Sequence, residues 1–511
     1  MDRTYLTTPI FYVNAEPHLG HTYTMVVVDT MARYCRARGL DTFFLTGTDE
    51  HGDKIAEAAG ATGETPKAYA DRISTLFRST WDALGIRYDH FIRTTDEHHR
   101  RFVQHVLDEV NRRGDIYFGE YGGLYCTGCE RFYLEKELVD GKCPDHKIAP
   151  KLVKEENYFF RMSRYQDRLL AHIEAHPDWI RPERYRNEVL GFLREPLEDL
   201  CISRPKSRLE WGIDLPFDRN FVTYVWFDAL LNYTSAAALR GEAFFDGFWP
   251  CAEHFIAKDI LKPHGVYWPT MLMAAGIPLY RHLNVHGYWT VEGDKMSKSL
   301  GNVIAPLAMT ARYGTDAFRY FLLRESVFGL DADFREETLV SRCNGDLANN
   351  LGNLVSRTLS MVQRYFQGKL PERSRPEPLD DELERAFTTA ASEIHEHMRN
   401  LGFNRALEAL LRGTDRANKY IAETAPFTLA KQPAQMPRVG TILRNLAEAL
   451  LHTARLVAPF LPDTGGRILD LLDVSPDRLA GPAPRWGEGL ATGHVLKAPV
   501  ALFPRIDARP S

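Results

Sequence analysis

Two histidines and a glycine stand close together near the start of the chain, in the stretch "EPHLGHTYT". His18 and His21 are three residues apart, Gly20 lies between them, and a strand-like run precedes them. If a helix begins here, its free N–H groups would favour a phosphate, and Gly20 would let a flat base lie against the backbone. Both imidazoles would face one side of that helix and could donate hydrogen bonds to oxyanions. On its own, the tetrapeptide also fits ordinary helix-start histidines or half of a metal site.

A second stretch, "GDKMSKSLGN" at 293–302, carries two lysines on a loop that is rich in glycine and serine and follows a strand-like run. Ammonium groups from Lys295 and Lys298 could neutralise a polyphosphate as it separates. By itself the stretch also fits a solvated basic loop. Its interpretation therefore depends on the histidine stretch upstream.

Four ligands of the kind that zinc prefers cluster in "CTGCERFYLEKELVDGKCPDH", with the spacing C-x2-C-x13-C-x2-H. Two tight pairs of this kind close a tetrahedron around Zn²⁺, and a site with four protein ligands is structural rather than catalytic. The chain has seven cysteines, an odd number that argues against a disulfide framework, and the other four are interpreted as core residues. We predict one structural zinc, held by Cys126, Cys129, Cys143 and His146.

The elements that must position these residues alternate between strand and helix in the first part of the chain. Residues 3–8 and 41–47 are rich in β-formers, and the intervening residues 20–39 have a helical pattern that ends in basic residues before a glycine. This strand–helix–strand order predicts a doubly wound α/β domain with a Rossmann-like parallel sheet.

The composition and the hydrophobic periodicity of the sequence change twice further along the chain. Short glycine-, cysteine- and aromatic-rich segments interrupt the α/β pattern, which then resumes, and a helical periodicity takes over in the last third. We therefore expect a catalytic α/β domain split by a zinc-knuckle insertion and followed by an all-α helical bundle. The expected boundaries are 1–114 and 216–325 for the two catalytic halves, 115–215 for the insertion, 326–345 for a linking segment, 346–480 for the bundle and 481–511 for an extended tail.

Composition restricts the remaining classes. The 511 residues are too many for one core, and hydrophobic and charged fractions of 44% and 26% are those of a globular protein. The net charge of −5 gives no overall attraction to nucleic acid, so any RNA contact must use local patches. No apolar run is long enough to cross a bilayer, and the N-terminus has no secretory pattern, so a cytoplasmic location without a membrane partner is expected.

In this order, the histidine and lysine stretches resemble the paired signatures of class I aminoacyl-tRNA synthetases, and Ser299 matches the last position of the second signature. The stretches "TTPIFYVNAEPHLGH", "FLTGTDEHG", "YVWFDALLNY", "FIAKDILKPHGVYWPTML" and "NVHGYW" resemble the methionyl-tRNA synthetase family, and the likeness runs from about residue 4 to the end of the bundle. The resemblance implies that His18 and His21 hold the ATP phosphates, that Gly20 makes room for adenine, and that Lys298 contacts the phosphates from its loop.

The resemblance also implies a methionine site. A thioether suits an apolar slot, since aromatic rings attract sulfur by about 0.3 to 1.5 kcal/mol. Asp49 would bind the substrate ammonium together with the backbone of Ile10. The alternative for each aromatic residue of the slot is ordinary core packing. The implied lining is Tyr12, Trp226, Leu230, Tyr233, Ile260 and His264, with Trp268 nearby.

In the resembled family, the helical bundle reads the CAU anticodon of initiator and elongator methionine tRNA. "NNLGNLVSR" resembles the recognition helix, with Asn353 and Arg357 on one face, although a solvated polar face is the alternative. "ETAPFTLAK" resembles a second element, but it has Phe427 where the family generally has tryptophan, so this base contact is the least certain. The chain shows no appended tRNA-binding barrel after "APVALFPRID", and a monomer is expected.

The implied reaction has two steps. The methionine carboxylate attacks the α-phosphate of ATP, which Mg²⁺ accompanies, to give methionyl-adenylate and pyrophosphate. The 3′-terminal adenosine of tRNA, through its 2′-hydroxyl in this family, then attacks the acyl group. A synthetase for leucine, isoleucine or valine would need a large hydrolytic insertion, and the space here is occupied by the knuckle. A small nucleotidyltransferase would lack the lysine loop and the bundle, and a non-catalytic RNA-binding relative would not need intact signatures.

Overall fold

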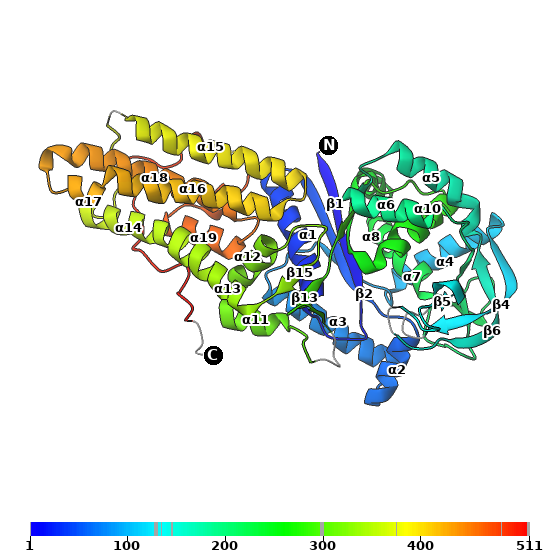
Figure 1. Cartoon of the computed structure of the whole chain (residues 1–511). Coiled ribbons are helices and arrows are strands. Elements are labelled where there is room, and N and C mark those ends of the chain that lie inside the picture. Colours follow the sequence, from blue (N-terminus) through cyan, green and yellow to red (C-terminus); the bar gives the residue numbers. More distant parts are fainter. Residues whose placement is uncertain are drawn as a thin grey trace.

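A computed structural model of the chain describes residues 2–126, 131–133, 135–144, 147–296, 301–374, 376–481 and 483–507. The molecule is elongated (Figure 1), with an α/β domain at one end and long antiparallel helices at the other. The α/β domain and the helical part meet beside α1 (Leu19–Ala37), the helix that begins within the histidine stretch. The site is therefore close to the junction of the two parts.

A six-stranded parallel sheet forms the centre of the α/β domain, in the order β3-β2-β1-β11-β12-β7. All five pairings are parallel, which confirms the predicted doubly wound sheet. The direction of the strand order reverses between β1 and β11, and this is where an open α/β sheet forms its binding crevice. The strands are β1 (Arg3–Tyr12), β2 (Asp41–Asp49), β3 (His90–Arg93), β7 (Ile180–Arg181), β11 (Ala252–Ala257) and β12 (His282–His286).

Each face of the sheet has its own hydrophobic core because side chains alternate along a strand. Leu6 and Phe44 pack on the side of α1, whereas Tyr5 and Phe43 pack on the opposite side. The first side is covered by α1, α3 (Pro66–Ala83) and α12 (Thr315–Glu325), and α2 (Asp53–Thr62) precedes α3. The second side is covered by α4 (Glu97–Arg112), α7 (Val225–Leu230), α8 (Asn232–Ala238), α9 (Glu242–Phe248) and α10 (Trp268–Ala275).

The segment expected as an insertion contains a separate antiparallel sheet, ordered β5-β4-β6-β8. Part of the same segment returns to the central sheet, because β7 pairs with β12 at its edge. A strand of two residues leaves no alternation in the sequence, so this return was not predicted. The segment comprises β4 (Ile116–Cys126), β5 (Arg131–Tyr133), β6 (Lys151–Phe160), α5 (Gln166–Ala175), α6 (Glu183–Phe192), β8 (Leu200–Cys201) and β9 (Ser203–Pro205), and β9 pairs with β10 (Phe221–Thr223).

A small sheet carries the lysine loop next to the central sheet. Strand β13 (Trp289–Val291) pairs with β14 (Asp294–Lys295) and with β15 (Ala332–Phe334). Gly287, just before β13, is in close contact with the loop that precedes β15, because a Cβ there would meet the backbone of Leu330 at 2.3 Å. Helices α11 (Pro306–Tyr313) and α13 (Glu336–Arg342) complete this connection to the bundle.

The last third is helical, as predicted. A π-helical segment (Cys343–Gly352) leads into α14 (Asn353–Phe366), and α15 (Pro378–Arg399) packs along α16 (Phe403–Thr424). Short α17 (Pro426–Leu429), long α18 (Met436–Val457) and α19 (Pro462–Leu471) follow. The tail is extended but not loose, since Leu490, Leu496 and Leu502 are buried against the bundle.

A buried ion pair joins α1 to the rest of the chain. Arg319 on α12 and Asp29 on α1 are both fully buried, with Nη2 and Oδ2 2.7 Å apart. The same guanidinium donates through Nε to the carbonyl oxygen of Phe460, 3.0 Å away, in the turn between α18 and α19. The position of α1 is thus fixed from the bundle side as well as by the sheet.

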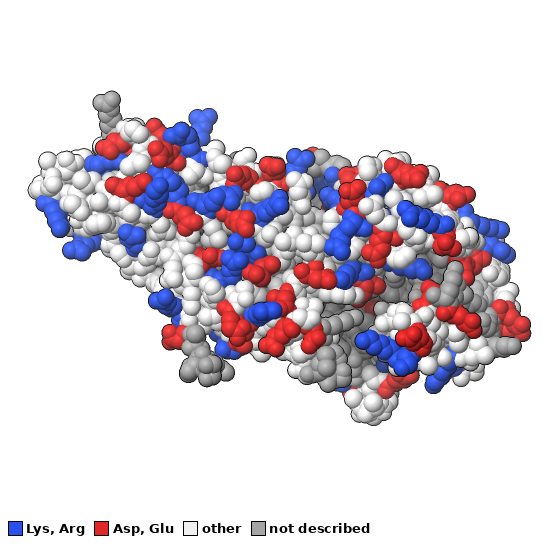
Figure 2. Space-filling model, viewed as in Figure 1, with Lys and Arg blue, Asp and Glu red and all other residues white. Residues whose placement is uncertain are grey.

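The surface carries charges of both signs. On the face shown in Figure 2, lysine and arginine alternate with aspartate and glutamate along the bundle. Arg416 pairs with Glu382 at 2.9 Å, and Arg412 pairs with Glu393. Interspersed charges of both signs give the face in Figure 2 no extended field of one sign. None of the described helices combines the length and the apolarity that crossing a bilayer requires.

Candidate active site

A cavity of about 380 Å³ opens at the carboxyl ends of β1, β2, β11 and β12, where the strand order reverses. The first turn of α1 forms one wall and α7 forms another. Eleven of the residues predicted for ATP and methionine line this single cavity. They are His18, Gly20 and His21 on one side, and Ile10, Tyr12, Asp49, Trp226, Leu230, Tyr233, Ile260 and His264 on the other.

The two histidines form the N-terminal cap of α1. The Nδ1 atom of His18 accepts a hydrogen bond from the backbone N–H of Gly20 at 3.1 Å, and Nδ1 of His21 accepts from the backbone N–H of His18 at 3.4 Å. An imidazole that accepts at Nδ1 carries its proton on Nε2. The capping box thus orients two Nε2–H donors at a helix N-terminus that already favours anions.

His21 is neutral at physiological pH. Burial lowers the pKa of His21 well below its usual value, and a positive charge on His18 would lower it further. The rings of Phe11 and Phe77 lie 5.0 and 5.5 Å from the ring of His21 and provide the apolar surroundings. A neutral imidazole in such surroundings can still donate to a phosphate, as the predicted role requires.

Gly20 is required by its nearest neighbour. A Cβ at this position would lie 3.1 Å from Cε1 of His18, closer than ordinary van der Waals contact. The glycine therefore first makes room for the imidazole that lies over it. Its position on the cavity wall is also compatible with the predicted space for adenine.

The lysine loop begins at the cavity. Met296 lines it, and the backbone of Lys295 ends β14. For Lys295 the structure describes the backbone alone, and Lys298 and Ser299 lie outside the described residues. The predicted contact of these lysines with phosphate stays a prediction.

An irregularity in β1 turns the next residues into the cavity. The register with β2 shifts between Thr7 and Ile10, and proline at position 9 cannot donate to the ladder. Beyond the bulge, Tyr12 pairs with Asp49 at the last position of β2. Asp49 is 8% exposed and lines the cavity together with Ile10. The carboxylate of Asp49 and the end of β1 at Ile10 thus border the same cavity, where the sequence predicted an ammonium-binding site.

The deep end of the cavity is apolar and uncharged. His264 directs Nδ1 at the carbonyl oxygen of Ile260, 2.9 Å away, so this nitrogen carries the proton, and its Nε2 accepts from the hydroxyl of Tyr233 at 2.8 Å. Burial lowers the pKa of His264 to about 4, and burial raises the pKa of Tyr233. A neutral slot of this kind suits a thioether and disfavours a charged side chain.

Trp268 takes a different position from the other predicted residues. It is fully buried behind the wall, with its ring 5.9 Å from that of Tyr233 and its Nε1 donating to Nε2 of His254 at 3.1 Å. It is not among the residues that line the cavity. Its contribution is therefore to support Tyr233 rather than to contact a ligand.

The sequence did not single out several polar residues of the cavity. Lys54 and Asp259 line it as charged groups, and Asn232 lines it at the start of α8. His286 also lines it, with Nε2 2.8 Å from the hydroxyl of Thr24. No spacing pattern or motif in the sequence distinguishes these residues from their neighbours. Asn232, Asp259 and His286 stand in the quoted stretches "YVWFDALLNY", "FIAKDILKPHGVYWPTML" and "NVHGYW", but nothing marked them as cavity residues.

The zinc knuckle is described only in part. Cys126 and Cys143 are both buried and belong to one small cluster with Tyr133. Cys129 and His146 lie outside the described residues. Two cysteines separated in sequence thus come together in one buried cluster, as the predicted ligand set requires, while the metal itself stays a prediction.

The predicted anticodon residues lie on the surface of the bundle. Asn353 is exposed and Arg357 is half-buried, one turn further along α14. Ala425 ends α16 in a left-handed conformation with φ 41°, and Pro426 starts α17, which carries Phe427 with 48% of its surface exposed. An exposed aromatic ring on a short helix is available for stacking.

Comparison with known proteins defines the class to which this fold and site belong. The family model described as tRNA synthetases class I (M) matches residues 4–150 and 146–359. The model described as the anticodon-binding domain of methionyl tRNA ligase matches residues 370–510. The doubly wound sheet with its histidine cap and the helical bundle are thus those of a class I aminoacyl-tRNA synthetase.

Individual relatives show which family within this class the chain resembles. A methionine–tRNA ligase from Deinococcus radiodurans is 48% identical over 513 residues, which cover 99% of this chain and 75% of the relative. One from Caldanaerobacter subterraneus is 46% identical over 505 residues, which cover 98% and 79%. The structure of Mycobacterium tuberculosis methionyl-tRNA synthetase in complex with methionyl-adenylate matches with a TM-score of 0.93 at 40% identity and covers 99% of this chain and 100% of that one. The chain belongs to the methionine–tRNA ligase family.

Proposed function

We infer that this chain joins L-methionine to tRNA through a methionyl-adenylate intermediate. The observation that carries this conclusion is the single cavity in which two capping histidines meet an uncharged aromatic slot beside Asp49. One side of the cavity suits phosphate groups, and the other suits a thioether with an ammonium group. The matched structure with methionyl-adenylate belongs to a relative that covers nearly the whole chain.

The first step joins the two substrates. A carboxylate oxygen of methionine attacks the α-phosphorus of ATP, the bond from that phosphorus to the α,β-bridging oxygen breaks, and the β- and γ-phosphates leave together as pyrophosphate. The Nε2–H groups of His18 and His21 would donate to phosphate oxygens as charge moves onto them. No general base is needed because the attacking group is already an anion, so positioning and charge stabilisation account for the rate. Lys295 and Lys298 would neutralise the departing pyrophosphate from their loop.

The amino-acid side of the cavity selects methionine. Asp49 and the backbone of Ile10 would hold the ammonium group at the carboxyl ends of β1 and β2. The side chain would then extend along Tyr12, Trp226 and Leu230 towards Tyr233 and His264. The fixed tautomer of His264 keeps the tyrosine proton engaged, so a thioether meets no unsatisfied donor there.

In the second step a hydroxyl of the 3′-terminal adenosine of tRNA attacks the acyl carbon, and AMP leaves with the bonding electrons of the mixed anhydride. We assign anticodon reading to Asn353, Arg357 and Phe427. Asn353 on α14 and Phe427 on α17 are exposed, and Arg357 is half-buried on the surface of α14, which supports contact with unstacked bases. The family model for an anticodon-binding domain covers residues 370–510, which include Phe427, and so supports the assignment of that residue.

Two metals accompany this function. Zinc would be held by Cys126, Cys129, Cys143 and His146, where it would tie the two halves of the knuckle together without reacting. The clustering and burial of Cys126 and Cys143 fit such a site. Mg²⁺ would enter with ATP and neutralise part of its charge. Reduced cysteines and a tRNA substrate both fit the cytoplasm.

The function is tested by charging assays with transcripts of methionine tRNA. The full chain should attach methionine to a transcript with a CAU anticodon, and a change of one anticodon base should lower kcat/KM by at least about 100-fold. Equal charging of both transcripts would contradict the assignment of anticodon reading. Absence of charging by folded, zinc-loaded protein would contradict the function itself.

A further inference from the structure

Asp49 belongs to the tripeptide Asp49–Glu50–His51, in which the two residues that follow it point into separate buried networks. Glu50 is fully buried and forms a bidentate ion pair with Arg93 on β3, with N···O distances of 2.6 and 2.8 Å. The hydroxyls of Thr48 and Thr95 donate to the same carboxylate at 2.7 and 2.5 Å. This side of the tripeptide is therefore bound rigidly to β3.

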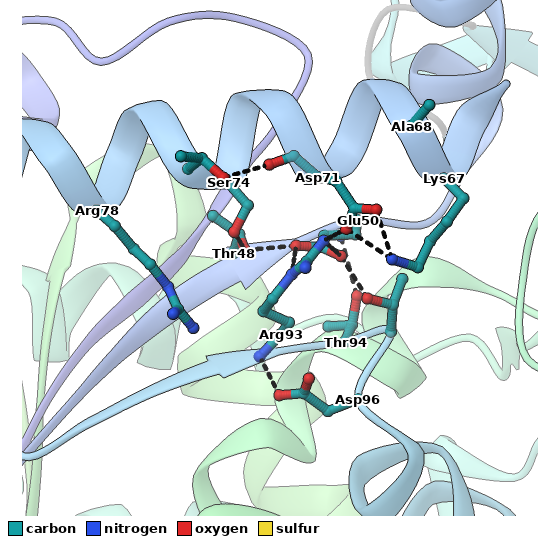
Figure 3. A network of polar contacts seen from close by, with 12 residues as sticks. Thr48, Glu50, Lys67, Ala68, Asp71, Ser74, Arg78, Arg93, Thr94 and Asp96 are labelled. Carbon is teal, nitrogen blue, oxygen red and sulfur yellow. Dashed lines mark hydrogen bonds and ion pairs between the residues drawn. The ribbon is translucent and has the colours of Figure 1, made fainter. Parts of the chain in front are cut away.

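Figure 3 shows this network between α3 and β3. Arg93 donates a further hydrogen bond to Asp71 on α3 at 2.6 Å, and Lys67 donates to the same residue from one turn earlier. The backbone N–H of Glu50 donates to the hydroxyl of Thr94 at 2.9 Å. Lys67 and Asp71 reach the surface, but the part of the network around Glu50 is buried and both carboxylate oxygens have partners, so the backbone next to Asp49 has little freedom.

The other network connects the tripeptide to α7. His51 lies 2.6 Å through Nδ1 from Oδ2 of Asp228, and His99 on α4 lies 2.8 Å through Nε2 from Oδ1 of the same carboxylate. The remaining ring nitrogen of His99 is 2.7 Å from the hydroxyl of Ser235 on α8. All three members of the triad are buried, and none of them lines the cavity.

Asp228 and the cavity wall lie on opposite faces of the same short helix. Trp226, Ala229 and Leu230 of α7 line the cavity, whereas Asp228 faces away from it towards His51 and His99. A helix of six residues has little stability of its own, so its rotation depends on tertiary contacts. Burial acts to raise the pKa of Asp228, but the charge and hydrogen bonds of the two histidines bring it below its usual value, so the carboxylate is ionised.

We propose that Asp228, held between His51 and His99, is a positioning residue that fixes the distance between the ammonium-binding carboxylate of Asp49 and the α7 wall, and thereby sets the affinity for methionine. This inference rests on the proposed function. One end of the triad, His51, is two residues from Asp49 in the chain, and the central member, Asp228, lies on the same helix as Trp226 and Leu230. ATP contacts the opposite side of the cavity, so its binding should not depend on the triad.

The test uses methionine-dependent exchange of pyrophosphate into ATP by the full chain. Asp228→Asn replaces one acceptor oxygen with a donor that faces an imidazole N–H. We expect the KM for methionine to rise about 10- to 100-fold, the range for loss of a buried hydrogen bond to a charged group. The KM for ATP and kcat should stay within about twofold of the unmodified chain.

A pair of variants at position 51 keeps the test valid if Asp228→Asn does not fold. The leucine and asparagine side chains of the variants His51→Leu and His51→Asn have nearly the same shape as each other. Only asparagine places an N–H close to the position of the histidine Nδ1. His51→Leu should raise the KM for methionine as Asp228→Asn does, and His51→Asn should keep it near the original value. Asp316→Asn is the matched control, since Asp316 is a buried carboxylate that accepts from Thr464 at 2.6 Å away from the cavity.

Unchanged methionine KM in both Asp228→Asn and His51→Leu would overturn the inference. Equal increases in the KM for methionine and for ATP, or the same increase in Asp316→Asn, would also overturn it, because they would indicate general destabilisation. If the unmodified chain itself showed no exchange with methionine, the proposed function would fail and this inference with it. The inference fails separately from the proposed function only when the unmodified chain shows exchange with methionine and the variants contradict the expected change in KM.

Discussion

The imidazole rings of His18 and His21 lie almost parallel, with centroids 3.7 Å apart and planes 22° apart. In this arrangement a positive charge on His18 would disfavour one on His21, and both rings use Nδ1 for the cap of α1. The pair therefore offers two neutral Nε2–H donors in a fixed direction. A polyphosphate meets a site that is already organised, without competition from bound protons or from alternative tautomers.

Replacing His21 should reduce adenylate formation more than substrate binding. His21→Asn removes the donor at the Nε2 position, and we expect kcat for pyrophosphate exchange to fall about 100- to 1,000-fold, the range for losing one donor to a developing charge. His21→Gln can place its amide N–H near the Nε2 position and should lose less activity. Equal loss in the two variants would indicate that the ring is needed for packing against Phe11 rather than as a donor.

Lys298 should act on the phosphates rather than on methionine. In Lys298→Ala, kcat for exchange should fall about 100-fold or more, with the KM for methionine within about twofold of the original value. Lys497→Ala, on the exposed tail beside Asp470, is the control and should change neither parameter. A parallel loss of methionine affinity in Lys298→Ala would be incompatible with the role assigned to this loop.

The free energy of unfolding should decrease as the pH falls from about 6.5 to about 4. Burial lowers the pKa of His264 from 6.5 to about 4, so the unfolded chain binds a proton in this interval that the folded chain does not bind. His264 alone contributes up to about 3 kcal/mol to this loss. Urea unfolding at several pH values measures the slope, and His264→Gln should make it shallower. Equal slopes for the two proteins would show that this imidazole is accessible to protons in the folded state.

One zinc per chain should be found by elemental analysis of the purified protein. Cys143→Ser should lower the metal content and the thermal stability of the insertion, because a structural zinc site contributes its binding energy to folding. Cys343→Ser changes a buried cysteine of the core far from the knuckle and should leave the metal content at one. Zinc retained in full by Cys143→Ser would require another ligand set.

Phe427 should contribute to tRNA binding and not to amino-acid activation. Phe427→Ala should raise the KM for tRNA about 5- to 100-fold, in line with about 1 to 3 kcal/mol for stacking of one base, while pyrophosphate exchange without tRNA stays unchanged. Phe427→Trp restores the larger ring and should not weaken binding. A loss of exchange activity in Phe427→Ala would point to misfolding of the bundle instead.

The sequence predicted the elements with strong local signals. The first strand, helix and second strand, expected at 3–8, 20–39 and 41–47, occupy 3–12, 19–37 and 41–49, because apolar alternation and helical periodicity decide their type. The two-residue strand β7 and the bulge before Ile10 have no such signal, since both arise from pairing with distant strands.

The candidate site also contains residues that the sequence could indicate and residues that it could not. Residues in contiguous motifs, such as His18 and Asp49, could be assigned from the sequence because a recognisable stretch surrounds them. The partners of Asp228 are 177 and 129 residues away in the chain, at His51 and His99, and no periodicity connects them. Only the fold brings these three side chains together, so their role could be inferred from the structure alone.

The central claim is that the cavity activates methionine, and the most direct measurement is amino-acid-dependent exchange of labelled pyrophosphate into ATP without tRNA. Methionine would be tested beside leucine, isoleucine, valine and cysteine at equal concentration. We predict exchange with methionine and at least about 100-fold lower kcat/KM for the others, because the slot that we propose at Tyr233 and His264 would favour a long, uncharged thioether. Comparable or faster exchange with any of the other four would contradict the account of the slot, and no exchange with any amino acid would contradict the assigned activity.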